Sequence, residues 1–156
     1  MPYKILLRLA KKSDKPEILK LLWKMHEEVS LGTLNKERAE AKVDEVLSKG
    51  CILVTEDVST KKLVGTVGLL ASSFWWTDQK ALGDVWCFVS PKYRKSRAFA
   101  MLLKGIKTIA KGLKLPVLLA NFGNVEESRK SKLYGRIGVK MGTTIIVDEE
   151  RQLIRS

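Results

Sequence analysis

The chain has 156 residues, enough for one ordinary domain whose hydrophobic core needs no metal or disulfide support. Its 45% hydrophobic and 29% charged residues are typical of a soluble globular protein rather than a disordered one, and no apolar run approaches the roughly 20 residues that cross a bilayer. The formal net charge of +12 is the unusual bulk feature and favours an anionic partner. We expect a single domain over residues 1–156, without a signal peptide and located in the cytoplasm.

The first half of the chain predicts a strand, two helices and three further strands. Residues 4–10 form an apolar run typical of a strand. Asp14 is expected to begin a helix by accepting hydrogen bonds from free amides, and the apolar side chains then recur at helical spacing as far as Val29. Asn35 begins a second helix that ends at Gly50. Three β runs follow, at residues 51–56, 63–71 and 81–90.

The second half predicts helices that alternate with strands. Pro91 ends the preceding strand because it cannot donate to a strand ladder. A helical period then runs from Ser96 to Leu113. The apolar run 116–122 is typical of a central strand covered on both faces. A helix over 124–137 and two strands, over 139–141 and 143–147, complete the chain.

Charge is distributed unevenly along the sequence. Residues 85–125 contain no Asp or Glu, and their eight basic residues are Lys92, Arg94, Lys95, Arg97, Lys104, Lys107, Lys111 and Lys114. The basic turn lies just before a helix, whose first amides are unpaired and carry the positive end of the helix dipole. This arrangement favours an anionic partner, which could be a phosphorylated cofactor, a nucleic acid or both.

Cysteine and histidine give no sign of a metal site. Cys51 and Cys87 lie within predicted strands, where we expect reduced, buried thiols. His26 is the only histidine and has no partners at metal-ligand spacing, so we expect a solvated or interfacial residue. A Ser–His–Asp triad would also need this histidine as its centre.

One stretch resembles a known family. The sequence CFVSPKYRKSRAFAMLLKGIKTIAK, followed by a strand and then by KLYGRIGVKMGTTII, resembles the core of the GNAT N-acetyltransferase superfamily. There a strand ending in Val-x-Pro precedes the acetyl-CoA pyrophosphate loop, usually Q/R-x-x-G-x-G/A, then a long helix and later Leu-Tyr-x-x-x-Gly-Phe. The chain matches at Val89, Pro91 and Arg94 and again over 133–138, with Val139 in place of Phe.

The resemblance implies an α/β (α+β) fold with a mixed, mostly antiparallel central sheet of about six to seven strands and four flanking helices. It also implies transfer of an acetyl group from acetyl-CoA to a primary amine of an unidentified acceptor, with no metal. Tyr134 would be the general acid that protonates the CoA thiolate, and Asp84 is the candidate base, although it is equally a turn residue after Gly83. The implied cofactor-binding residues are Phe88, Val89, Arg94, Lys95, Ser96, Arg97, Ala98, Phe99 and Asn124.

The loop departs from the family pattern. Arg97 and Phe99 stand where the family has small residues, usually glycine, that let the backbone approach the pyrophosphate. The Arg-x-Ser-x-Ala form resembles phage-encoded members, and a backbone nest with added arginine charge would still hold a diphosphate. A degenerate loop that binds nothing is the alternative. Glu127 stands where the family commonly has Asn, so an amide contact would come from Asn121 or Asn124.

Two other functions stay open at this stage. The basic stretch also fits a nucleic-acid-directed protein on the same fold, which either acylates a base or an aminoacyl-tRNA or only binds. The missing loop glycines fit an inactive binding or inhibitory module. Trp75 and Trp76 are candidates for the acceptor pocket, the core or the contact of a possible homodimer.

Overall fold

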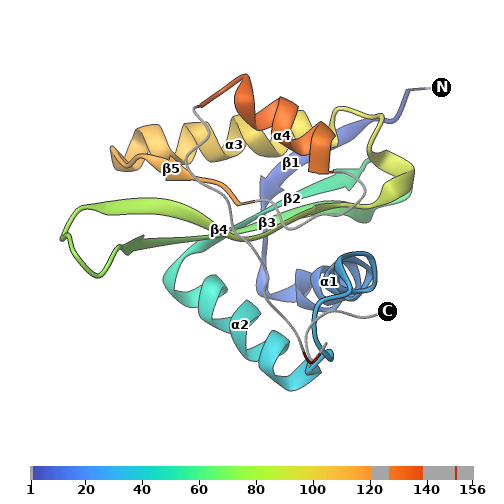
Figure 1. The fold of residues 1–156 in the computed structure, drawn as a ribbon. Coiled ribbons are helices and arrows are strands. Elements are labelled where there is room, and N and C mark those ends of the chain that lie inside the picture. The colour runs from blue at the N-terminus through green and yellow to red at the C-terminus, as the bar shows by residue number, and fades with distance from the viewer. Residues whose placement is uncertain (1, 121–126, 139–149, 151–156) are drawn as a thin grey trace.

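A five-stranded sheet lies at the centre of the computed structural model, which describes residues 2–120, 127–138 and 150 (Figure 1). The strands are β1 (Ile5–Leu9), β2 (Cys51–Asp57), β3 (Lys62–Ser73), β4 (Lys80–Val89) and β5 (Val117–Leu118). They lie in the order β1-β2-β3-β4-β5. Every neighbouring pair is antiparallel except β4 and β5, which are parallel. The predicted mixed, mostly antiparallel α/β fold is therefore confirmed.

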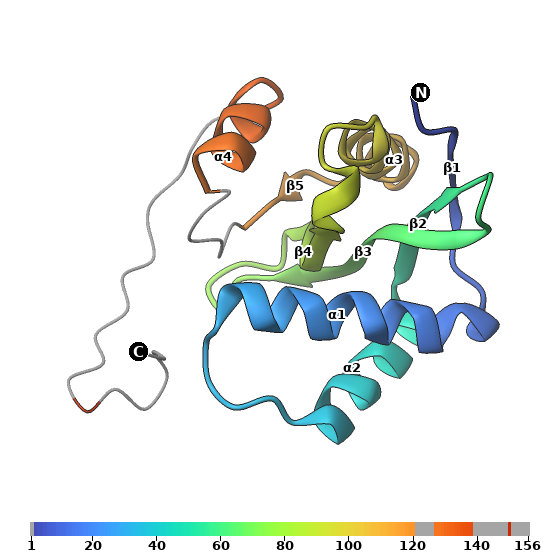
Figure 2. The same ribbon diagram turned by 90° about the vertical axis from the view of Figure 1, so that its right-hand side faces the viewer.

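Helices cover both faces of this sheet (Figures 1 and 2). On one face lie α1 (Lys15–Val29) and α2 (Lys36–Lys49); on the other lie α3 (Ala98–Leu113) and, beside it, α4 (Glu127–Gly135). Two short 3₁₀ turns, η1 (Lys12–Asp14) and η2 (Pro91–Tyr93), lead into α1 and toward α3. None of the helices in the described ranges is both long and apolar enough to cross a membrane.

Alternation along the strands builds one core under each helical layer. Residues of β4 such as Cys87 and Val89 pack with Leu102 and Ile106 of α3, whereas Trp86 and Phe88 pack on the α1 and α2 side. Gly105 lets α3 lie close to the sheet, since a Cβ there would be 2.8 Å from the Leu53 side chain. This close packing brings the middle of α3 onto Leu53 of β2 and Leu7 of β1.

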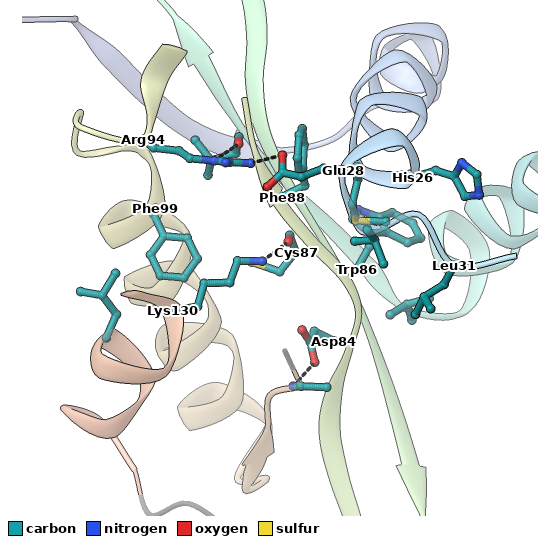
Figure 3. A pocket seen from close by; sticks show the side chains of 16 residues that line it. His26, Glu28, Leu31, Asp84, Trp86, Cys87, Phe88, Arg94, Phe99 and Lys130 are labelled. Atoms are coloured by element: carbon teal, nitrogen blue, oxygen red, sulfur yellow. Dashed lines mark hydrogen bonds and ion pairs between the residues drawn. The ribbon is translucent and has the colours of Figure 1, made fainter. Parts of the chain in front are cut away.

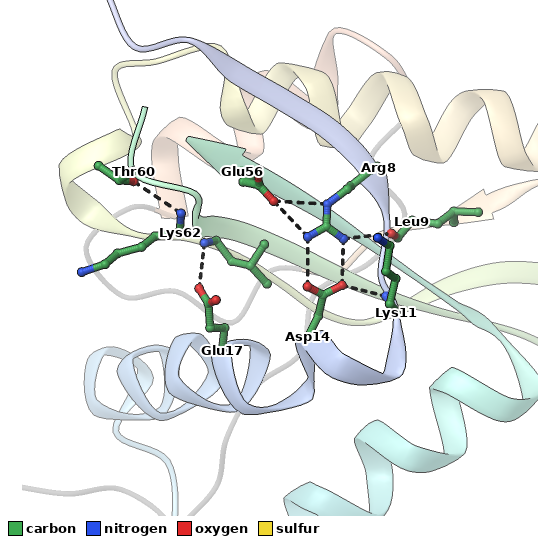
Figure 4. A network of polar contacts seen from close by, with 9 residues as sticks. Arg8, Leu9, Lys11, Asp14, Glu17, Glu56, Thr60 and Lys62 are labelled. Atoms are coloured by element: carbon green, nitrogen blue, oxygen red, sulfur yellow. Dashed lines mark hydrogen bonds and ion pairs between the residues drawn. The ribbon is translucent and has the colours of Figure 1, made fainter. Parts of the chain in front are cut away.

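The start of α1 is held by an ion-pair network rather than by the predicted cap (Figure 4). The Arg8 guanidinium donates to both oxygens of Asp14, at 2.7 and 2.9 Å, and to Glu56 at 3.0 Å. The Arg8 contact lowers the pKa of the Asp14 carboxyl. Glu17 accepts from the amide of Leu63 on β3 instead of reaching back to its own helix. The helix begins where predicted, but long-range partners hold it.

The predicted elements match the structure closely up to Leu113 and less closely beyond it. The run 116–122 was expected to form a central strand, but β5 pairs with β4 through only two residues and Leu118 is 45% exposed. Within the described residues β5 is the last strand of the sheet, and residues 121–122 of the predicted run lie outside them. The described residues contain five strands rather than six to seven. The strands predicted over 139–141 and 143–147 lie outside them.

Candidate active site

A bulge divides β4 into two parts. Gly68 of β3 lies opposite Trp86 and the next residue, Leu69, lies opposite Asp84, so Val85 has no partner on β3. A bulge of this kind adds one residue to a strand and re-aims the residues after it. Before the bulge β4 pairs with both β3 and β5, whereas after it β4 pairs with β3 alone among the described strands.

The second part of β4 therefore presents an open edge. The Ser90 amide donates to the Val64 carbonyl of β3 at 2.8 Å. Main-chain groups of successive residues point to opposite edges of a strand, so Phe88 also faces β3 while Cys87 and Val89 face away from it. The structure thus places the main chain of Val89 at the open edge and that of Phe88 inside the sheet. Cys87 joins Val89 there, which the sequence prediction missed.

A pocket of about 310 Å³ lies along this edge (Figure 3). Its lining comes from the end of α1, the second part of β4, the turn before α3, the start of α3, the end of β5 and α4. Among the predicted site residues, those in the lining are Asp84, Phe88, Val89, Arg94 and Phe99. The fold has therefore collected residues from six separate segments around an edge of β4 that pairs with no other described strand.

Arg94 spans this pocket rather than facing solvent. Its Nε donates to the Val89 carbonyl at 3.0 Å, and its terminal nitrogen lies 2.6 Å from a carboxylate oxygen of Glu28 on α1 (Figure 3). The guanidinium also lies over the Phe88 ring, 5.5 Å from its centroid. Arg94 thus connects the predicted pyrophosphate loop to β4 and to α1. No sequence pattern pointed to Glu28, because its partner is 66 residues away.

The turn before α3 is anchored by a buried tyrosine. The Tyr93 hydroxyl donates to Asp57 at the end of β2, at 2.9 Å, and both side chains are buried. Ser96 Oγ donates to the Tyr93 carbonyl at 2.5 Å and accepts from the amide of Ala98 at 3.1 Å. Ser96 therefore satisfies one of the amides expected to face an anion.

Charge in the loop lies on its outer side. Lys95 and Arg97 are exposed, whereas Ala98 is fully buried against the core. Farther along α3, Lys104, Lys107 and Lys111 are exposed, and the helix contains no acidic residue. The outer side of α3 and its leading turn is therefore a basic surface, as the sequence predicted.

Tyr134 lies in the core beside the pocket rather than in its lining. Its ring packs on Phe99 with 5.9 Å between centroids, and its hydroxyl is buried without a hydrogen-bond partner among the described residues. Burial raises the pKa of this hydroxyl well above its usual range, and the neighbouring Cys87 thiol adds to the shift. The raised pKa keeps the hydroxyl protonated but makes it a weaker acid, and a buried hydroxyl without an acceptor is available to donate a hydrogen bond.

Burial also decides the chemistry of Cys87. It raises the pKa of the Cys87 thiol to about 11. The thiol is therefore protonated near neutral pH, and only the thiolate is a good nucleophile. A covalent acyl-cysteine step at this residue is disfavoured.

Asp84 lies where β4 and β5 separate. Its carboxylate accepts from the Ala120 amide at 2.9 Å, just after β5 ends (Figure 3). Burial raises the pKa of this carboxyl, although the Ala120 hydrogen bond opposes the shift. Nearby, Lys130 of α4 donates to the Cys87 carbonyl at 2.9 Å across the open edge. Lys130 was not among the predicted site residues.

The remaining predicted residues lie elsewhere in the structure or outside the described ranges. Asn121 and Asn124 lie outside the described residues. Trp75 and Trp76 are 92% and 63% exposed in the turn between β3 and β4, where Trp76 stacks on Phe74. They are therefore not core residues. His26, expected to be solvated or interfacial, lies in the pocket lining, with its Nε2 3.1 Å from the Gly32 carbonyl oxygen.

No protein-family model matches the sequence, and no curated protein matches it either. Solved structures, in contrast, match almost the whole chain. A glucosamine-6-phosphate N-acetyltransferase from Arabidopsis thaliana is 18% identical, with a TM-score of 0.68 over 92% of this chain and 97% of that one. A ribosomal-protein-alanine N-acetyltransferase from Brucella melitensis is 16% identical, with a TM-score of 0.68 over 92% and 97%.

An aminoglycoside 6'-N-acetyltransferase from Acinetobacter haemolyticus is also similar, at 12% identity and a TM-score of 0.66 over 91% of this chain and 95% of that one. Identities of this size establish the fold alone. The chain has the fold of the GNAT N-acetyltransferases, as the sequence resemblance predicted. The three neighbours are named for three different acceptors, so the shared fold leaves the acceptor open.

Proposed function

We propose that this GNAT-fold chain transfers an acetyl group from acetyl-CoA to the nitrogen of a primary amine. The open edge of β4 is the observation that carries the proposal. Beyond the bulge, the main chain of Cys87 and Val89 faces a pocket instead of another described strand. An extended, amide-containing arm such as that of CoA can add to such an edge as a strand would.

The residues present fit this cosubstrate. The Val89 carbonyl already accepts from Arg94, and the Val89 amide faces the same edge, where it can donate to a carbonyl. The exposed Lys95 and Arg97 and the first turn of α3 supply positive charge for phosphates. Acetyl-CoA supplies an activated acyl group, whose transfer forms a C–N bond, breaks the C–S bond and releases the thiol.

Two side chains have environments suited to the proton transfers. Asp84, whose pKa is raised by burial, is better matched than an ordinary carboxylate to accept a proton from the amine, directly or through water. Tyr134, in the position of the tyrosine that serves the GNAT family as general acid, would supply the proton that the departing sulfur needs, and it lies beside the pocket, packed on the lining residue Phe99. The protonated Cys87 thiol supports direct transfer rather than a covalent enzyme intermediate.

A calorimetric titration with acetyl-CoA, followed by an assay of free thiol release with an amine panel, tests the proposal. We expect saturable binding and amine-dependent thiol release. No binding at millimolar acetyl-CoA would overturn it. Binding without release for any amine would instead favour the inactive binding module.

Tyr134→Phe tests the general-acid assignment. We expect kcat to fall by about 10²-fold or more, because general acids typically contribute that much, while the acetyl-CoA Kd changes little. The ring packing on Phe99 is retained in this variant, so the unfolding transition serves as the control. If turnover is unchanged, the assignment is withdrawn.

The basic side of α3 supports a second candidate, a nucleic acid as acceptor or partner. Lys104, Lys107 and Lys111 are exposed, and α3 contains no acidic residue. The measurement is affinity for duplex DNA and for tRNA as a function of salt. Phosphate contacts require a steep negative slope, and a slope near zero would exclude them.

A further inference from the structure

The pocket has two halves that differ in their lining. Along β4, Cys87 and Val89 belong to the core on the α3 side, whereas Trp86 and Phe88 belong to the core on the α1 side. If the arm of acetyl-CoA adds to the open edge, as proposed above, the half next to α1 is left for the acceptor. Figure 3 shows Trp86, Glu28, His26 and Leu31 around that half.

The α1 half offers apolar surface. Its apolar lining residues are Met25, Val29, Leu31, Trp86 and Phe88. Two polar groups there already have protein neighbours: Trp86 Nε1 donates to Thr66 Oγ1 at 3.2 Å, and His26 Nε2 lies 3.1 Å from the Gly32 carbonyl oxygen. A hydroxyl group of an acceptor that packs against the apolar side chains would lose water without regaining a hydrogen bond from them, which is unfavourable.

Charge in the described lining is balanced. Its two acidic residues, Glu28 and Asp84, are matched by two basic ones, Arg94 and Lys130. Glu28 is directly paired with Arg94 at 2.6 Å, and Lys130 is close enough to Asp84 to influence its pKa. A site that selects polycations needs an excess of negative charge, so this lining does not attract an aminoglycoside. The net charge of +12 disfavours polycations further.

The volume limits the size of the acceptor. The whole pocket is about 310 Å³, near the lower end of the roughly 300–1,000 Å³ typical of ligand sites. Part of that volume is needed for the acyl-bearing arm. We infer that the acceptor is a small primary alkylamine that carries an aromatic ring or a branched aliphatic group, and that this group packs between Trp86, Phe88 and Leu31.

The test compares acceptors in the thiol-release assay. The apolar amines are 2-phenylethylamine and isoamylamine; the polar ones are ethanolamine, glucosamine 6-phosphate and kanamycin. We expect kcat/KM for 2-phenylethylamine to exceed that for ethanolamine by about 100-fold, because even one methylene in an apolar pocket is worth about tenfold or more. A short peptide that begins with Phe serves as the large acceptor and should be used more slowly than the free amine.

Leu31→Asn probes the same surface by mutation. Leu31 is half-buried in the lining, and a polar amide of similar size should lower kcat/KM for 2-phenylethylamine about tenfold while the acetyl-CoA Kd stays constant. Leu113→Asn is the matched control, because Leu113 is 56% exposed at the end of α3 and should leave both values unchanged.

The outcomes separate this inference from the proposed function. If acetyl-CoA does not bind, or if no amine in the panel is acetylated, the proposed function fails and the inference fails with it. If acetyl-CoA binds but ethanolamine, a sugar or the peptide is preferred over 2-phenylethylamine, only the acceptor inference is overturned. The acceptor inference would also be overturned if Leu31→Asn left the ratio of kcat/KM for 2-phenylethylamine to that for ethanolamine unchanged.

Discussion

The two parts of β4 differ in their partners and in their use. Before Val85 the strand pairs with β3 and, at Leu82 and Gly83, with β5, and its role is to hold the sheet together. After Val85 the same strand has one described partner, and its other edge lines a pocket. The difference coincides with one inserted residue and with the early divergence of β5. One strand can therefore serve both as a structural element and as the edge of a pocket.

Deleting Val85 should have the largest effect on acetyl-CoA binding, because it removes the distinction between the two parts. Val85 is the residue without a partner on β3, so its deletion would leave Asp84 opposite Leu69 and Trp86 opposite Gly68 in a regular ladder, without the bulge at which β4 changes partners. We expect the acetyl-CoA Kd to rise about tenfold or more, measured by calorimetry, because the second part of β4 is no longer re-aimed by the bulge.

Val85→Ala is the control for this deletion, because the Val85 side chain is 40% exposed and the bulge is kept. It should cost less than about 1 kcal/mol and change the acetyl-CoA Kd far less than the deletion does. If the deletion binds acetyl-CoA as tightly as wild type, the bulge is not required for the open edge.

Asp84→Asn, at the junction of the two parts of β4, should lower activity while keeping the hydrogen bond that Asp84 contributes to the structure. We expect kcat/KM to fall by about 10²-fold or more if Asp84 is the base. An amide oxygen can still accept from Ala120, so the contact at 2.9 Å is kept. An unchanged kcat/KM would remove Asp84 from the mechanism.

The difference in stability between this variant and wild type should depend on pH. Burial raises the pKa of the Asp84 carboxyl in the folded state, so protonation favours folding. This contribution is complete below the unfolded pKa of about 3.9 and is lost as pH rises through the folded pKa. The difference in Tm between Asp84→Asn and wild type should therefore increase across that window and level off above it. A difference that does not vary with pH would contradict the raised pKa.

A smaller effect is expected from adding a single methyl group beside each part. A Cβ on Gly68 would lie 2.6 Å from the Trp86 ring in the second part, whereas one on Gly83 in the first part would lie 3.8 Å from its nearest described neighbour. Gly68→Ala should therefore cost about 1–3 kcal/mol through overpacking, and Gly83→Ala should be neutral or slightly stabilising. Thermal unfolding of both variants checks this, and equal effects would contradict the packing difference.

The predictions from sequence were accurate where local patterns decide structure. Helical spacing, Asn35 as a cap, and the Gly50 and Pro91 stops predicted the positions of α1, α2, β2, β3 and β4 to within a few residues. The motif from Asp84 onward predicted the fold that the solved structures share. The site was predicted only in part, since Asp84, Val89, Arg94 and Phe99 line the pocket but their partners were not foreseen.

Sequence alone thus determined the elements, the basic side of α3 and the fold, because strand alternation, helical period and charge are properties of neighbouring residues. Tertiary structure decided the rest. The Val85 bulge depends on the register with β3, and the short pairing of β5 depends on where that strand leaves β4. The Arg94–Glu28 and Lys130–Cys87 contacts join residues 66 and 43 positions apart. Such contacts depend on how the layers pack, which a local pattern does not encode.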